Sequence, residues 1–310
     1  MIARCLHIAG VFWLVTIFPA NAVEILVKPG EGTLVRAIFA AAPGDKLVLS
    51  PGLYQGKVII DRSLEIKGAL GSEIIGDSAG SVITIDAADV TVSSLKISGS
   101  GSDHDTIDAG VKLTQKATNA RVKNNQLFEN LYGVDVHGAR DAIVSGNTIE
   151  GRSGARMNER GNGIYVWNAP GTVIENNHIR LGRDGIFVNT SKKNVFRGNR
   201  MENLRFAIHY MYANDSVVEG NVSVGNHLGY ALMFSSRLVV KNNVSTNDRD
   251  HGIMLNYANG SKISGNQVSG GGKKCLFMYN ANKNILTGNT FSKCPIGIHF
   301  TAGSERNKIF

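Results

Sequence analysis

Three side chains in this sequence could bind a soft metal ion: His209, Met211 and Met233. Imidazole and thioether groups are ligands that suit Cu(I). His209 and Met211 are two residues apart, so on a β-strand they would share a face at a separation of about 7 Å. Met233 comes one repeat later and is expected on the next strand, beside His209 and about 4.8 Å away. The sequence therefore indicates a candidate copper site.

A docking surface is the second interpretation of these residues. Aromatic, methionine and histidine side chains recur at equivalent outward positions, and together they define a docking stripe: Tyr165, Trp167, Phe187, Met254, Phe277, Tyr279 and His299. Contiguous exposed apolar residues mark interaction sites, and methionine-rich surfaces adapt to their partners. From the spacing alone, docking is favoured over metal binding, and both interpretations stay open.

Catalytic chemistry has weaker support. Histidines and carboxylates group at residues 103–105 (DHD) and 248–251 (DRDH), with Arg183 and Asp184 at an equivalent corner. Glycoside hydrolysis needs two carboxylates about 5 to 10 Å apart across an open cleft. Charges next to a corner glycine are more simply explained as solvated turns, so we do not expect an enzyme. The alternative is a carbohydrate-active protein, either a polysaccharide lyase or epimerase or a glycan-binding module that stacks its aromatic rings on sugars.

These residues belong to a repeat of about 22 residues. An asparagine marks it, with steps of 22, 30, 22, 22, 22, 23 and 23 residues: Asn125, Asn147, Asn177, Asn199, Asn221, Asn243, Asn266 and Asn289. The one long step contains an insertion at residues 152–162. Stacked on successive rungs, these asparagines would form a buried ladder of amides, which is a structural role.

A second register defines the strands. Each strand begins with a small residue: Gly110, Gly133, Gly163, Gly185, Ala207, Ala231, Gly252, Cys275 and Gly297. Val, Ile or Leu follows, and another apolar residue, such as Val136 or Phe234, comes two positions later. Side chains two apart share a face, so these residues are expected to point inward. Short strands in 22-residue coils predict a parallel β-helix, and the strong preference of parallel crossovers predicts a right-handed one.

The two ends of the solenoid differ. Residues 33–42 predict a short amphipathic helix that covers the first coil, since an open solenoid end needs protection. At the other end, residues 306–310 open a new strand and the sequence stops before the corner. We therefore expect that the last coil is truncated or is covered by something absent from this sequence.

Composition and the first residues indicate an exported protein. An apolar run and an A-x-A site at residues 20–22 predict a cleavable signal peptide over residues 1–22, with one β-helix domain over 23–310. No stretch approaches the roughly 20 apolar residues of a transmembrane helix. The net charge is +8, but the basic residues are scattered, which argues against a nucleic-acid partner. Cys275 and Cys294 are expected to form a disulfide in an oxidising compartment, with soft-metal ligation as the other possibility.

The outward residues of the later coils resemble those of a known family. The stretches are GNGIYVWN at 161–168, RDGIFVNTS at 183–191, RFAIHYMYANDS at 205–216, GNHLGYALMFS at 225–235, DRDHGIMLNYANGS at 248–261 and GIHFTAGSERN at 297–307. Generic β-helix sequences share only the Gly-Ile and Gly-Asn skeleton. HYMYAN and ALMFS are specific, and they are similar to the NosD family of periplasmic copper-processing proteins.

That resemblance implies a non-enzymatic role in the periplasm. Members of the family are thought to act with ABC transporter subunits and a copper chaperone lipoprotein in the maturation of nitrous-oxide reductase. On this reading His209, Met211 and Met233 are candidate copper ligands, and the docking stripe contacts partner proteins. Family members usually extend past the point where this chain ends.

Overall fold

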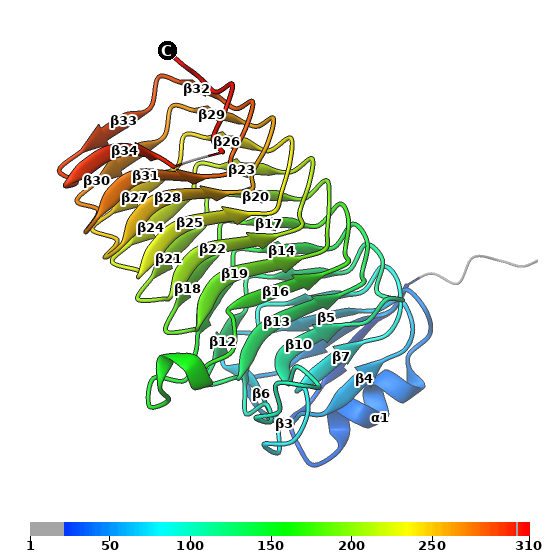
Figure 1. Cartoon of the computed structure of the whole chain (residues 1–310). Helices are drawn as coiled ribbons and strands as arrows, with labels where there is room; N and C mark the ends of the chain where they lie inside the picture. The colour runs from blue at the N-terminus through cyan, green and yellow to red at the C-terminus, as the bar shows by residue number, and fades with distance from the viewer. Residues whose placement is uncertain (1–21, 302) are drawn as a thin grey trace, which may run out of the picture.

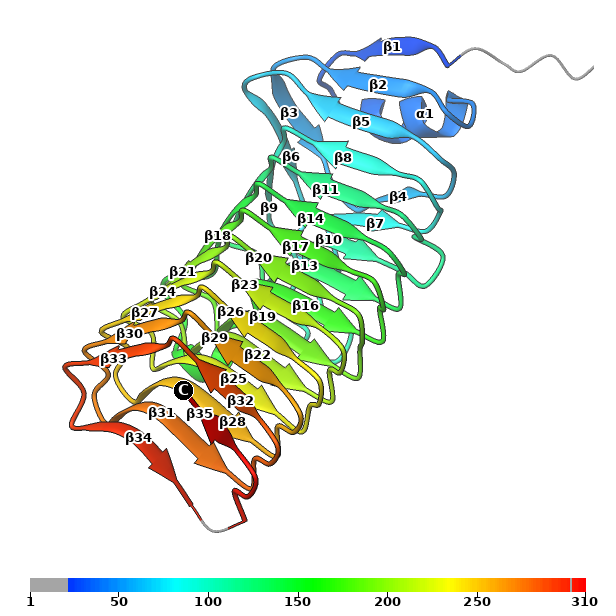
Figure 2. The same cartoon turned by 90° about the horizontal axis from the view of Figure 1, so that it is seen from above.

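The computed structural model describes residues 22–301 and 303–310, which form a right-handed parallel β-helix of about 13 coils, as predicted (Figure 1). The signal peptide predicted for residues 1–22 falls almost wholly outside the described residues. Successive coils contribute strands to three parallel sheets, which we call walls A, B and C and which contain 13, 11 and 11 strands within the described residues. Figure 2 shows the strands of wall A in succession, from the blue N-terminal end to the red C-terminal end. No helix in the described part of the chain is long and apolar enough to span a membrane.

The three walls contain the strands in chain order. Wall A consists of β1 (Glu24–Val27), β2 (Lys46–Leu49), β5 (Glu65–Gly68), β8 (Thr91–Ser93), β11 (Arg121–Lys123), β14 (Ile143–Ser145), β17 (Val173–Glu175), β20 (Val195–Arg197), β23 (Val217–Glu219), β26 (Val239–Lys241), β29 (Lys262–Ser264), β32 (Ile285–Thr287) and β35 (Lys308–Ile309). Wall B consists of β3 (Gly52–Gln55), β6 (Ser72–Ile75), β9 (Lys96–Ser98), β12 (Gln126–Phe128), β15 (Thr148–Glu150), β18 (His178–Arg180), β21 (Arg200–Glu202), β24 (Val222–Val224), β27 (Val244–Thr246), β30 (Gln267–Ser269) and β33 (Thr290–Ser292). Wall C consists of β4 (Val58–Ile60), β7 (Ile83–Ile85), β10 (Ala109–Leu113), β13 (Tyr132–His137), β16 (Ile164–Trp167), β19 (Asp184–Asn189), β22 (Phe206–Met211), β25 (Leu228–Met233), β28 (His251–Asn256), β31 (Lys274–Tyr279) and β34 (Ile296–Phe300).

The core lies inside the coils, where the inward side chains of all three walls meet. On wall C, Val134 and Val136 are fully buried, as are their register partners Ile164 and Val166 on the next strand. Alternation of side chains along each strand places every second residue outside. Wall C therefore presents a continuous outer surface whose positions are fixed by the core beneath it.

The predicted asparagine ladder is confirmed between walls A and B. Asn199 shows the pattern: its amide nitrogen donates to Ile174 O and to Asn221 Oδ1, both at 2.9 Å. The backbone N–H of Asn199 also donates to Asn221 Oδ1, at 3.0 Å. A buried amide must have its hydrogen bonds satisfied, and here each rung satisfies the next. The ladder is thus part of the fold and not of a binding site.

The N-terminal end is covered as expected. Helix α1 (Thr33–Ala40) buries Leu34 and Ile38 against the first coil (Figure 2). The helix ends two residues earlier than the predicted 33–42, because Ala41 is extended. Strand β1, which the sequence did not reveal, precedes the helix and pairs in parallel with β2.

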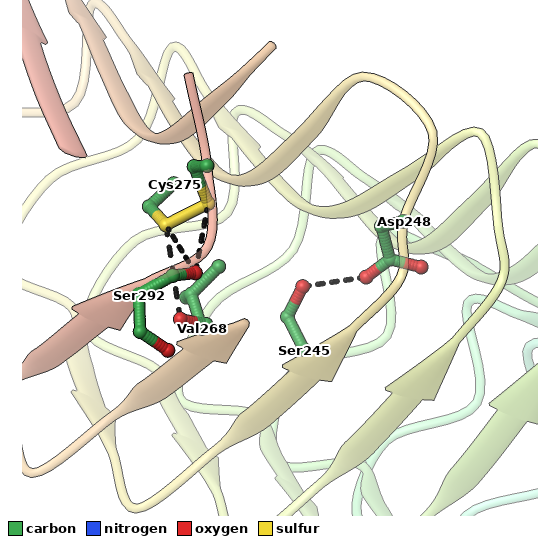
Figure 3. The surroundings of a disulfide bond; sticks show 6 residues. Ser245, Asp248, Val268, Cys275 and Ser292 are labelled. Carbon is green, nitrogen blue, oxygen red and sulfur yellow. Dashed lines mark hydrogen bonds between the residues drawn. A yellow bond between two sulfur atoms is a disulfide. The ribbon is translucent and has the colours of Figure 1, made fainter. Parts of the chain in front are cut away.

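Cys275 and Cys294 form the predicted disulfide, with their Cα atoms 5.6 Å apart, which excludes soft-metal ligation by this pair. Cys275 occupies an inward position on β31, and Cys294 lies in the turn between β33 and β34. Figure 3 shows the bond beside the backbone carbonyls of Val268 and Ser292, which lie 3.7 and 3.5 Å from Cys275 Sγ. The bond ties the end of one coil to the strand of the coil before it.

Candidate functional site

Wall C carries the outward residues that the sequence analysis selected. One outward column runs through register-paired residues: Lys112, Asp135, Tyr165, Phe187, His209, Ala231, Met254, Phe277 and His299. The second column lies two positions along each strand: His137, Trp167, Asn189, Met211, Met233, Asn256 and Tyr279. All seven residues of the predicted docking stripe therefore lie on one wall.

The predicted register was wrong on β25. Met233 pairs with Met211, and the partner of His209 is Ala231, so Met233 does not sit beside His209. Tyr230 is the reason: its ring fills an inward position, and its hydroxyl donates within the core to Asn221 O at 2.8 Å. Tyr230 takes the inward position beside Ile208, whereas the sequence analysis began this strand at Ala231, which resembled the small residue that begins the other strands.

The same shift moves Phe234, which was predicted to point inward. It follows β25 in a left-handed turn with a φ of 48°, and Tyr212 and Tyr257 occupy the same turn on the neighbouring coils. The ring centroids of Tyr212 and Phe234 are 5.3 Å apart, and those of Phe234 and Tyr257 are 5.2 Å apart. This turn stack borders the methionine pair and was missed by the sequence analysis. Its signal was the aromatic residue directly after Met211 and Met233.

The three candidate copper ligands remain neighbours in the corrected register. Met211 and Met233 are side by side on β22 and β25, about 4.8 Å apart by strand geometry. His209 is two residues before Met211 on the same face, and it lies diagonally from Met233 at roughly 8 Å between Cα atoms. Both methionines are partly exposed, and their side chains are long and flexible, so their sulfur atoms can approach one ion together with the imidazole.

His209 is buried and held in one orientation. Its Nδ1 lies 3.1 Å from Asp184 Oδ2, and Arg205 donates to both oxygens of Asp184, at 2.7 and 2.6 Å. Burial raises the pKa of Asp184, but the hydrogen bonds from His209 and Arg205 outweigh it, so the pKa lies below its ordinary value. Asp184 is therefore charged and fixes the imidazole through Nδ1. Nε2 is left as the atom that can bind a metal, as in many metal sites where a carboxylate orients the histidine ligand.

These donors fit Cu(I) better than a hard cation. Within residues 22–301 and 303–310, no three His, Cys, Asp or Glu side chains group as a metal site. Two thioethers and one imidazole are soft, neutral ligands of the kind that Cu(I) accepts. The chemistry of the donor set thus matches the ion that the sequence suggested.

Rings on wall C stack on one another. The centroid distances are 5.4 Å from Tyr165 to Phe187 and 4.7 Å from Phe187 to His209, with interplanar angles below 30°. Trp167 stacks on His137 at 4.4 Å. Because these faces are occupied by neighbouring rings, the surface offers ring edges. A sugar ring stacks on an aromatic face, so this surface is poorly suited to bind one.

One outward residue of wall C is a buried carboxylate. Asp135 is fully buried, and burial raises its pKa to about 7, although Lys112 Nζ at 3.5 Å opposes the shift. Neither of its oxygens accepts a hydrogen bond from the described residues. His137 Nδ1 lies 3.8 Å away. Asp135 occupies an outward position of the strand, but its burial depends on packing that the sequence does not show.

The acidic motifs do not assemble a pair of catalytic carboxylates. Asp103 accepts the backbone N–H of Asp105, and His104 contacts Tyr132 and Glu159 O, both at 3.2 Å. Asp248 is buried and accepts hydrogen bonds from two serine hydroxyls, including that of Ser245 (Figure 3). Asp248 is thus engaged by strands β24 and β27 of wall B, and His104 contacts β13 of wall C.

The insertion at 152–162 packs against the loop that carries His104. It includes one turn of 3-10 helix at Met157–Glu159. Arg152 donates to Ser100 O, Gly101 O and Ser102 Oγ, at 2.6 to 2.8 Å. The two segments form a rim that projects beside wall C near β10 and β13 (Figure 1).

Comparison with known proteins gives a consistent picture. The sequence model of the family described as "Periplasmic copper-binding protein (NosD)" matches residues 145–310. Two curated relatives carry the name "Probable ABC transporter binding protein NosD". The protein of Stutzerimonas stutzeri is 38% identical over 84% of this chain, and that of Pseudomonas aeruginosa is 34% identical over 91%. The chain spans only 63% and 68% of the length of these two relatives.

Solved structures resemble the fold at low identity. The A-module of mannuronan C-5 epimerase AlgE6 from Azotobacter vinelandii has a TM-score of 0.63 and 12% identity, covering 89% of this chain and 93% of that chain. The surface adhesin PfbA of Streptococcus pneumoniae has a TM-score of 0.61 and 12% identity, covering 86% and 88%. An enzyme and an adhesin share this architecture, so these similarities show the fold alone.

Proposed function

The chain belongs to the NosD family, and on that premise we propose that it is a periplasmic accessory protein in the assembly of the copper centres of nitrous-oxide reductase. It would act with an ABC transporter and a copper chaperone lipoprotein. The observation that carries the proposal is the Met211 and Met233 pair beside His209, with the imidazole oriented by Asp184. Copper is cargo in this role, and the docking stripe is where a partner that delivers or receives copper would bind.

The donors suit a transfer site. Cu(I) binds thioethers and imidazole, and Nε2 of His209 is the atom that Asp184 leaves free. Met211 and Met233 are partly exposed on the outer face of wall C, so a partner protein could reach an ion held between them. The aromatic and methionine residues around them supply an adaptable contact surface.

A non-enzymatic role agrees with the carboxylates of wall C. Asp184 is engaged by Arg205 and His209, and Asp135 is closed off from solvent. The alternative, a carbohydrate-active protein, requires a pair of free carboxylates or open aromatic faces. Turnover of alginate or pectate by the mature chain would support that alternative and contradict the accessory role.

Copper titration tests the site directly. The mature chain would be titrated with Cu(I) under anaerobic conditions in competition with a chromogenic chelator. We expect one high-affinity ion, with affinity lowered about tenfold or more in His209→Ala, Met211→Ala and Met233→Ala. Met157→Ala, in the insertion, is the matched control and should bind as the wild type does. Unchanged Cu(I) stoichiometry and affinity in all three site variants would contradict the assignment of these residues as copper ligands.

Partner binding needs a separate measurement. A pull-down with the reductase, the chaperone and the transporter, run with and without Cu(I), would show which of them the chain contacts. Replacing Phe277 and Tyr279 by alanine should weaken capture while leaving copper binding intact. Equal capture by the wild type and this variant would remove the docking stripe from the proposal.

A further inference from the structure

A recess of about 340 Å³ opens beside wall C, next to the projecting rim. Strands β13, β16, β19 and β22 form its floor, and the loop that carries His104 forms its side. Its lining includes Tyr132, Asn162, Arg183 and Arg205, together with His209 and Met211. This volume lies at the small end of the range for small-molecule sites.

The recess has one uncompensated positive charge. Arg205 and Asp184 neutralise each other through two hydrogen bonds. Arg183 is half-buried, and in the described part of the chain its guanidinium has no carboxylate within 4.0 Å and no hydrogen-bond acceptor. Burial raises the pKa of Tyr132, and the charge of Arg183 acts against that shift, which places Arg183 near the phenol. A single planar guanidinium pairs best with a carboxylate, through two parallel hydrogen bonds.

The polar groups around Arg183 are arranged to bind a hydroxyl. His104 Nε2 lies 3.2 Å from Glu159 O, which can only accept, so this nitrogen carries the proton. In this tautomer Nδ1 accepts from the hydroxyl of Tyr132, at 3.2 Å. The lone pairs of the phenol oxygen are left to accept a hydrogen bond from a ligand. Asn162 Oδ1 accepts the N–H of Asp184 at 3.3 Å, so the amide NH₂ of Asn162 is available as a donor.

We propose that this recess binds a small hydroxylated carboxylate, with its carboxylate on Arg183 and a hydroxyl between Tyr132 and Asn162. A monoanion matches the single free cation, and a hydroxyl matches the paired acceptor and donor. Binding rests on an ion pair and hydrogen bonds, so it does not need an open aromatic face. The site goes beyond the proposed copper function, although His209 and Met211 border both.

Galacturonate and galactose are a matched pair of probes, because they differ only at C6, where galacturonate has a carboxylate and galactose has a hydroxymethyl group. Ligand-observed NMR and calorimetry on the mature chain should show that galacturonate binds at least about tenfold more tightly than galactose. Acetate, which lacks the hydroxyls, should bind more weakly than galacturonate. Equal binding of galacturonate and galactose, or binding of neither, would overturn the proposal.

Variants assign the site and separate it from copper. Arg183→Gln should weaken galacturonate binding by about tenfold, and Tyr132→Phe should weaken it less. Arg180→Gln, on wall B, is the matched control and should have no effect. Met233 does not line the recess, so Met233→Ala should lose copper affinity and keep galacturonate, whereas Arg183→Gln should do the reverse. Unchanged galacturonate binding in Arg183→Gln, with its melting temperature intact, would refute the assignment.

Discussion

At the scale of single residues, Asp184 contributes to both the candidate copper site and the recess on wall C. It hydrogen-bonds His209 through Nδ1 and neutralises Arg205 at the edge of the recess. A carboxylate that orients a histidine ligand typically contributes about 10- to 100-fold to metal affinity. We therefore expect copper affinity to depend on this buried carboxylate as well as on the three candidate ligands.

Replacement of Asp184 by Asn should lower Cu(I) affinity by about tenfold, because the amide no longer holds Nδ1 of His209 as a charged acceptor does. Chelator competition would measure the loss. Asp215→Asn is the matched control, since Asp215 forms the same two-point pair with Arg237 on the exposed surface. If both variants bind copper as tightly as the wild type, Asp184 does not position the ligand.

Asp135 should make stability depend on pH. Its pKa is about 7 in the fold, above the ordinary carboxyl value near 4, so the folded state holds the proton more tightly than the unfolded chain. Stability is therefore lost as the pH rises from about 4 to 7. Asp135→Asn should raise the free energy of unfolding at pH 8 by up to about 3 to 4 kcal/mol, and by much less at pH 4.

Urea unfolding at the two pH values would test this, with the exposed Asp61→Asn as the control. The groups that face Asp135 are Lys112 on β10, His137 on its own strand and Tyr165 on β16. A gain of the same size at both pH values would mean that the carboxyl does not titrate between them.

At the scale of the elements, stability comes from rungs that repeat. Asn221→Ala should lower the free energy of unfolding by about 2 to 4 kcal/mol, because it removes four side-chain hydrogen bonds, two donated by Asn221 and two accepted from Asn199, and leaves buried groups unpaired. Urea denaturation would measure the change. Gln267→Ala on β30, where the side chain is exposed, should change stability by less than about 0.5 kcal/mol. Similar losses in both variants would show that the ladder is not the cause.

The repeat made most elements predictable from the sequence. The asparagine steps and the alternating apolar residues were sufficient for the ladder and the inward columns, and the amphipathic pattern of residues 33–42 was sufficient for the covering helix. The prediction failed on β25 because a tyrosine can satisfy its hydroxyl inside the core, and only the neighbouring carbonyls decide this. One slipped strand changed the partner of Met233 and hid the stack of Tyr212, Phe234 and Tyr257.

At the scale of the whole molecule, the disulfide fixes the last coils to one another. The cysteines are 19 residues apart, and a crosslink over a loop of this length contributes about 3 kcal/mol by restricting the unfolded chain. The Cys275→Ala, Cys294→Ala double variant should be less stable by about that amount, and a reductant should lower the melting temperature of the wild type alone. Two free thiols in the untreated mature chain would contradict this.

Features built from distant segments lie beyond prediction from the repeat. The recess needs the His104 loop, the insertion and four strands in one place, and Arg183 acquires its role from them. The sequence showed that His104 and Arg183 were candidates for chemistry, but it assigned them to solvated turns. Nothing in the 22-residue period specifies how an inserted segment folds back on its own coil.

The constant register also has a genetic consequence. Val173, Val195 and Val217 are successive partners on wall A, so loss of residues 195–216 would leave Val217 beside Val173. Such a deletion removes His209 and Met211 and keeps the ladder unbroken, because Asn221 then follows Asn177. Gain or loss of one coil can thus change the outer surface in a single event, while the strand register and the asparagine ladder continue without a break.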